Sequence, residues 1–147
     1  MASTLTASTM TVTLTESINL NGTNQGSSNS LSLASIAEVS KRIVTCPTSE
    51  ITLVSFGAAA AAGTFIDADV RYVRITNLDD TNFVMLNIEG EGTTDITLRL
   101  DASASLMLIG SLVNYADTGA YSLENLTGIK ADADTASCDL EIFVASA

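Results

Sequence analysis

Apolar residues alternate with small polar residues along many short segments of this chain, and this period of two constrains its fold more than any other feature. From Met10 to Leu20, aliphatic side chains fall on one side of an extended chain and mainly hydroxyl side chains on the other. This pattern indicates a β-strand with one buried face. Glu16 is the single exception on the apolar side. The segment is therefore predicted to be a half-buried strand.

Segments of this kind recur along the whole sequence and are separated by turn-forming residues. We expect strands at residues 10–20, 41–46, 51–56, 69–77, 82–88, 96–100, 106–109, 120–123, 126–131 and 138–144. About eight to ten short strands at this spacing indicate an all-β fold, an antiparallel β-sandwich that is jelly-roll-like. Thr and Ser occupy 36 of the 147 positions, and Thr suits the exposed face of a pleated sheet. We expect an extended N-terminal arm at residues 1–10 and a single sandwich domain at residues 11–147.

Two segments raise questions of local structure. Ser35 and Glu38 have the spacing of a helix-capping box, which allows a short helix over residues 36–42, whereas the β-branched residues before Pro47 favour a strand at 41–46. Residues 34–40 stay open between the two interpretations. Leu78-Asp79-Asp80-Thr81 has the composition of a tight turn and predicts a hairpin between the strands at 69–77 and 82–88.

Two loops are candidate contact surfaces. Residues 21–30 contain no apolar side chain and predict a long exposed loop or hairpin tip, and five alanines flanked by Gly57 and Gly63 predict a close-packed loop. The residues expected to form an interaction surface are Asn21, Gly22, Asn24, Gln25, Gly57 and Gly63.

Charge limits the kinds of partner. The chain has 17 acidic and 6 basic residues, which gives a net charge of −11. Such a surface repels phosphate backbones, so nucleic acid is not an expected partner. The sequence has no run of about 18 apolar residues, so no membrane span is predicted. The first 40 residues lack the basic residues of a secretory signal.

Candidate chemistry is sparse. The sequence contains no His, the commonest general base, so we expect no catalytic site and no cofactor. Cys46 and Cys138 are predicted to be free, buried thiols, with a disulfide between them as the alternative. Asp132, Asp134 and Asp139 are a weak Ca²⁺ candidate that departs from the EF-hand pattern, the other interpretation being an exposed acidic turn.

Three stretches carry a resemblance: residues 40–52 (SKRIVTCPTSEIT), 69–82 (DVRYVRITNLDDTN) and 129–146 (IKADADTASCDLEIFVAS). Together they cover about 45 residues and resemble segments of small virion structural proteins of tailed bacteriophages, especially marine ones. The resemblance implies a capsid decoration (cement) subunit on the outer capsid surface, made in the host cytoplasm, with the major capsid protein as partner. A tail-fibre, receptor-binding or tail-accessory module is the alternative, and a carbohydrate-active enzyme is a third class.

The scarcity of Lys and Arg has a consequence for assembly. Charged residues, especially Lys, protect the edge strands of sandwiches from pairing with other chains, and this chain has only six basic residues. We therefore expect a homo-oligomer, specifically a homotrimer, with a monomer whose edge strands are short and twisted as the alternative.

Overall fold

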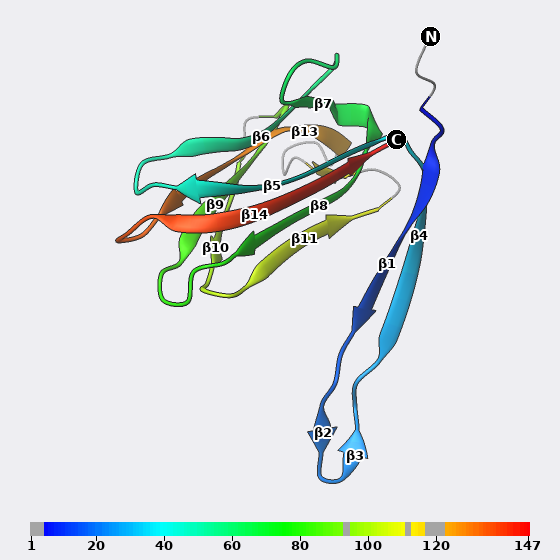
Figure 1. Cartoon of the computed structure of the whole chain (residues 1–147), viewed down its shortest axis with the longest axis vertical. Coiled ribbons are helices and arrows are strands. Elements are labelled where there is room, and N and C mark those ends of the chain that lie inside the picture. The colour runs from blue at the N-terminus through cyan, green and yellow to red at the C-terminus, as the bar shows by residue number, and fades with distance from the viewer. Residues whose placement is uncertain (1–4, 93–94, 111–112, 117–122) are drawn as a thin grey trace.

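A computed structural model describes residues 5–92, 95–110, 113–116 and 123–147, and almost all of its regular structure is β (Figure 1). The strands are β1 (Ser8–Thr15), β2 (Asn19–Leu20), β3 (Thr23–Asn24), β4 (Ser28–Ile36), β5 (Glu38–Cys46), β6 (Ile51–Gly57), β7 (Thr64–Ile66), β8 (Val70–Asn77), β9 (Val84–Gly90), β10 (Ile96–Leu100), β11 (Ser105–Ile109), β12 (Asn114–Ala116), β13 (Leu123–Ala133) and β14 (Cys138–Ser146). A short 3-10 turn, η1 (Asp67–Asp69), precedes β8. Among the described residues, no helix has the length and apolar character needed to span a membrane.

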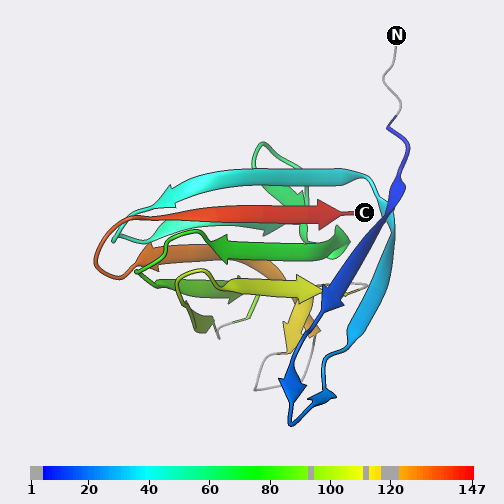
Figure 2. The same cartoon turned by 60° about the horizontal axis from the view of Figure 1, so that its bottom comes forward.

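Two sheets form the body of the molecule and lie as two layers (Figure 2). The four-stranded sheet has the order β11-β8-β14-β5, and the six-stranded sheet has the order β10-β9-β13-β6-β7 with β12 paired to β13. All neighbours are antiparallel except β6 and β7. The facing sides of the two sheets bury one apolar core. Its largest fully enclosed side chains are Leu53, Ile75, Leu86, Ile129, Leu140 and Ile142.

The strand order is that of a jelly roll. Four of the frame strands, β5, β8, β11 and β14, lie in one sheet, and the other four, β6, β9, β10 and β13, lie in the opposite one. The chain passes from one sheet to the other six times, between β5 and β6, β7 and β8, β8 and β9, β10 and β11, β11 and β12, and β13 and β14, which produces two interlocked Greek keys. The prediction of an all-β, antiparallel, jelly-roll-like sandwich is confirmed.

The predicted hairpin across residues 78–81 is wrong. The turn is present, but β8 pairs with β11 and β14 while β9 pairs with β10 and β13. The buried Asn77 side chain ties the end of β8 to the opposite sheet, because its Nδ2 donates to the carbonyl oxygens of Asn82 at 2.9 Å and Leu100 at 3.4 Å. A local turn signal does not specify which strand the next segment joins, and here the turn carries the chain between layers.

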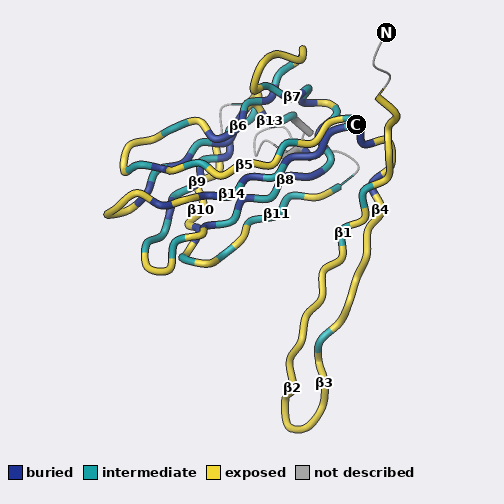
Figure 3. The backbone as a smooth tube through the Cα atoms, in the orientation of Figure 1, coloured by how far each residue is buried: buried dark blue, intermediate teal, exposed yellow. Residues whose placement is uncertain are grey.

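Residues 8–36 lie outside the two sheets as a β-hairpin, which we call the hairpin arm. β1 pairs with β4, the short strands β2 and β3 form its tip, and the arm projects away from the sandwich (Figure 1). Most of its length is exposed (Figure 3). The prediction of a strand across residues 10–20 is therefore right in its period but wrong in its burial, because none of the described residues forms a second layer over the distal part of the arm.

The remaining local predictions have mixed outcomes. The predicted strand at residues 41–46 is confirmed within β5, and β5 begins at Glu38, so the alternative helix over 36–42 is not formed. β4 occupies residues 28–36, so the apolar-free segment 21–30 is a hairpin tip that runs into a strand. Residues 120–122 of the strand predicted at 120–123 and residues 1–4 of the predicted 1–10 arm lie outside the described residues, and Leu123 begins β13.

Candidate interaction surface

The hairpin arm has two chemically different faces. On one face, Met10 lies opposite Leu33, and Val12 lies opposite Leu31, so aliphatic side chains line both strands. The other face carries hydroxyl groups that form hydrogen bonds across the strands, between Thr13 and Ser30 at 2.8 Å and between Thr15 and Ser28 at 3.0 Å. The alternation seen in the sequence therefore separates an apolar face from a hydroxyl face, with Asn29 and Glu16 as the polar positions on the apolar face.

The root of the arm is anchored on the outer face of the four-stranded sheet. Leu33 and Ile36 are buried against Tyr72 of β8 and Ala145 of β14, which form a second apolar cluster separate from the main core. Four partly buried residues complete this root cluster: Met10, Val12, Met107 and Phe143. The backbone N–H of Ala37 also donates to the carbonyl of Ser146 at 2.9 Å.

A β-bulge marks the root. Between the pairs Ser8↔Ile36 and Met10↔Leu33 the register shifts, since β4 contains one more residue than β1. Ser35 lies in this bulge with a φ of 61°, a left-handed conformation that is uncommon for a residue other than Gly. Bulges bend strands, and this one lies where the arm leaves the sheet.

Beyond the root, the apolar face of the arm is uncovered. Leu14, Ile18, Leu20 and Leu31 are between 45% and 55% exposed. Between this face and β11 lies an apolar groove of about 300 Å³. We call it the arm groove; its lining is Val12, Leu14, Asn29, Ser30, Leu31, Met107 and Ile109. An isolated two-stranded hairpin is at best marginally stable in water, so this face is a surface that gains stability from being covered.

Two glycines shape the tip. Asn21 and Gly22 have φ values of 53° and 82°, which is the geometry of a type I′ turn between β2 and β3. At Gly26, an added Cβ would lie 2.1 Å from the carbonyl oxygen of Glu16, so only Gly permits the close approach of the two strands there. Glu16 is the only charged residue among the first 37, and its carboxylate accepts a hydrogen bond from the Ser27 hydroxyl at 3.1 Å.

The predicted interaction residues separate into two groups. Asn21, Gly22, Asn24 and Gln25 are exposed at the arm tip, whereas the loop from Gly57 to Gly63 lies between β6 and β7 at the opposite end of the molecule (Figure 1). The structure does not bring these groups together. Sequence reasoning missed the aliphatic residues that line the arm groove; the signal for them was an alternating apolar pattern inside a segment almost free of charge.

The predicted calcium ligands do not form a site. Asp132 lies on β13, Asp134 follows that strand, and Asp139 lies on β14, where its carboxylate accepts a hydrogen bond from the Thr45 hydroxyl at 2.7 Å. Among the described residues, no group of three or more acidic, Cys or His side chains is arranged to hold a metal ion.

Cys46 and Cys138 are free, buried and directly opposite each other on β5 and β14, as the thiol prediction expected. Burial, followed by the neighbouring thiol of Cys138, raises the pKa of Cys46 from 9.0 to about 11. Burial likewise raises the pKa of Cys138. Both side chains are therefore neutral thiols near pH 7, which are weak nucleophiles.

Charged groups gather on another part of the four-stranded sheet. Lys41 Nζ lies 3.2 Å from a carboxylate oxygen of Glu141, and Arg74 pairs with the other oxygen. The Arg74 hydrogen bond and then the Lys41 hydrogen bond lower the pKa of Glu141. This ion pair network is built from β5, β8 and β14, whereas the arm groove contains no charged residue.

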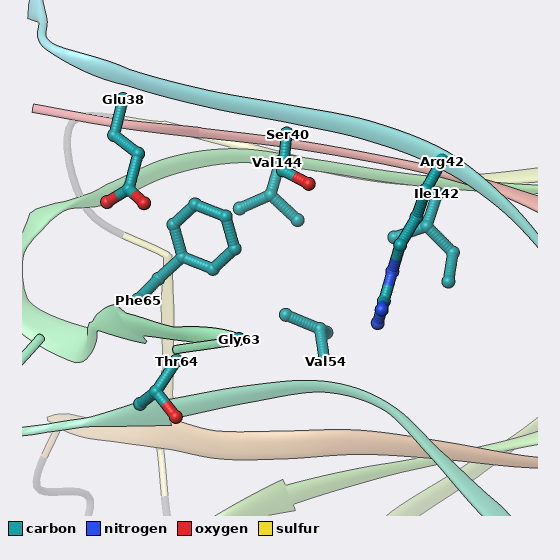
Figure 4. Close-up of a pocket in the computed structure, with 9 residues that line it drawn as sticks. All are labelled: Glu38, Ser40, Arg42, Val54, Gly63, Thr64, Phe65, Ile142 and Val144. Atoms are coloured by element: carbon teal, nitrogen blue, oxygen red, sulfur yellow. The ribbon is translucent and has the colours of Figure 1, made fainter. Parts of the chain in front are cut away.

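A small cavity opens between β5 and the β6–β7 side of the sandwich (Figure 4). Its volume is about 140 Å³, and Ser40, Arg42, Val54 and Phe65 are among the residues around it. The Arg42 guanidinium donates a hydrogen bond to the Leu53 carbonyl. Ligand pockets usually measure about 300 Å³ or more, so this cavity is small for a ligand. Its polar lining is Glu38, Ser40, Arg42 and Thr64.

Comparison with known proteins finds no matching family model, no matching curated protein and no matching solved structure. The fold and its surface define the class of the molecule: a jelly-roll sandwich that carries a projecting hairpin arm with an uncovered apolar face.

Proposed function

We propose that this protein is a non-enzymatic structural subunit of a virus particle, a capsid decoration subunit that binds neighbouring shell proteins through its hairpin arm. The observation that carries the proposal is the uncovered apolar face of the arm, formed by Leu14, Ile18, Leu20 and Leu31. A jelly roll is a fold used by viral capsid domains, as well as by lectins and cupins. The resemblance of three stretches to tailed-phage virion proteins supports the viral assignment.

The energy available from the arm suits a protein that works in many copies. Burying a whole Leu or Ile side chain contributes about 1.5–3 kcal/mol, so covering four half-exposed ones contributes on the order of 4 kcal/mol per arm. That is weak for a single contact. Repeated over every copy on a shell, it adds to the energy required to open the particle, and partner binding stabilises only the assembled state.

The distribution of charge indicates which part of this protein contacts its partners. The sandwich carries nearly all of the charge, whereas the first 37 residues carry only Glu16. An arm with a single ionised group contacts a shell protein at little cost of removing water from charges. The major capsid protein and copies of this chain are the proposed partners, on the outer surface of the capsid.

The test is reconstitution on particles that lack the protein. Purified wild-type protein is expected to bind at hundreds of copies per particle, counted by mass spectrometry of washed particles, and to raise the temperature at which the particles release their genome. Leu14→Asn with Leu31→Asn is expected to reduce the copy number at least tenfold. Leu78→Asn is the matched control, since Leu78 is also about half exposed (47%) but lies in the turn between β8 and β9.

Three results would contradict the proposal: no particle binding by the wild type, binding that the arm variant retains in full, or binding with no gain in heat resistance. A handful of copies per particle, together with loss of adsorption when the protein is removed, would instead assign a tail-fibre or receptor-binding role.

A further inference from the structure

We infer that the arm groove of one copy receives the arm tip of a second copy of this chain. The inference rests on the proposed function and deepens it, because it names a partner for the arm within the layer of decoration subunits. It is argued from the chemistry of the groove, the chemistry of the tip and the distribution of charge.

The groove is built to accept an uncharged, extended segment. One wall is the arm itself, through Leu14 and Leu31, and the other is β11, through Met107 and Ile109. β11 is an edge strand of the four-stranded sheet, and its sequence, SLMLI, contains no charged residue. Edge strands without charges or Pro are available for contact with another strand.

The arm tip has the matching chemistry. Ile18 and Leu20 are two residues apart, which places both side chains on one face of an extended chain, and they are 48% and 55% exposed. Residues 17–25 contain no charge. The groove has a volume of about 300 Å³, which is room for two four-carbon side chains.

The distribution of charge favours the arm tip and the arm groove over other faces as the contact between two copies. Each copy has a net charge of −11, so two copies repel each other wherever their acidic sandwiches meet. Tip and groove carry no charged residue, so a contact between them brings no acidic groups of the two copies together. Within one copy the tip does not reach its own groove, since Leu14 and Leu20 lie on the same ribbon, about 20 Å apart at roughly 3.3 Å per residue.

The expected contact is reversible. The uncovered stretch of the arm face from Leu14 to Leu20 is roughly 20 Å long and 10 Å wide, or about 200 Å², which is below the roughly 800 Å² per partner of a standard interface. Tip and groove are different patches, so a head-to-tail contact between them is heterologous; such contacts form closed rings where the rotation between copies closes and open filaments where it does not. A closed ring of three copies agrees with the homotrimer expected from the sequence.

The test is disulfide trapping between engineered cysteines in the full chain. Leu20→Cys with Ile109→Cys places one thiol on the tip and one at the groove. Leu20→Cys with Leu98→Cys is the matched control, because Leu98 is as exposed as Ile109 (37% and 38%) but lies on β10 of the other sheet. Cys46 and Cys138 are buried and are expected not to react.

On oxidation with oxidised glutathione, the tip–groove pair is expected to form reducible intermolecular products at least ten times faster than the control pair, ending in covalent trimers. Circular dichroism confirms that both variants keep the β fold. Equal trapping of the two pairs, or monomers alone for both, overturns the inference. So does sedimentation that shows the same mass for wild type and Leu20→Asn at every concentration tested.

The two proposals fail separately. Tip–groove trapping without binding to particles would retain the inference and refute the decoration role. Particle binding by the wild type without tip–groove trapping would retain the decoration role and show that the arm binds a shell protein, not a second copy.

Discussion

Replacing Leu33 by Ala is expected to loosen the hairpin arm without unfolding the sandwich. Leu33 is only 4% exposed and lies in the root cluster with Ile36, Tyr72 and Ala145. Buried Leu→Ala changes cost about 2–5 kcal/mol, and a small cluster at the surface can relax around the cavity, so we expect about 2–3 kcal/mol. Because this cluster is separate from the main core, the loss should appear in the arm and not in the two sheets.

Native-state hydrogen exchange, measured by mass spectrometry on dilute protein, separates the two regions. A loss of 2–3 kcal/mol corresponds to about 30- to 150-fold faster exchange in peptides from residues 8–36. Peptides from β14 and the denaturant midpoint of the sandwich should change little. Leu31→Ala is the matched control, since Leu31 lies two residues earlier on the same strand and the same face but is 45% exposed. Its effect in the monomer should stay within about 0.5 kcal/mol.

Two results would refute this reasoning. Equal acceleration in the arm and in β14 would mean that arm and sandwich unfold as one cooperative unit. Equal effects of Leu33→Ala and Leu31→Ala would mean that the arm is held along its length and not at its root.

Three further outcomes follow from single features of the structure. Gly26→Ala should accelerate hydrogen exchange at the arm tip, since its Cβ would lie 2.1 Å from the Glu16 carbonyl oxygen; unchanged exchange would contradict that close approach. Cys46 and Cys138 should resist thiol reagents at pH 8 until denaturant is added. Because burial raises the pKa of Cys46 from 9.0 to about 11, the contribution of this thiol to the free energy of unfolding should be constant below about pH 9 and fall between pH 9 and 11, as the unfolded thiol ionises first. Rapid labelling of the folded protein would count against buried thiols. Asn77→Asp should lower the free energy of unfolding by about 3–5 kcal/mol in urea titrations despite its equal size, because an ionised carboxylate would face main-chain carbonyls in a buried turn; a stability equal to the wild type would show that the amide donor is dispensable.

Much of the fold could be predicted from local pattern. The period-two segments at residues 96–100 and 138–144 are strands β10 and β14, and the β-branched residues before Pro47 are part of β5. Those predictions succeed because alternation and side-chain branching act within a few residues of chain. Only half of the candidate surface could be predicted from local pattern. The polar tip at Asn21 and Gly22 was evident in the sequence, whereas the arm groove requires β11, which is some eighty residues further along the chain.

The sequence by itself determined that the segment from Met10 to Leu20 is extended, that one of its faces is apolar, and that it carries a single charge. Only the tertiary structure decided that this face is left uncovered beyond the root cluster. It also decided that the turn after Asn77 crosses between sheets and does not close a hairpin. The physical reason is the same in both cases. Periodicity and turn chemistry are properties of neighbouring residues, whereas the partner of a strand and the cover of a face depend on residues far away in the chain, which compete for the same edge and the same layer.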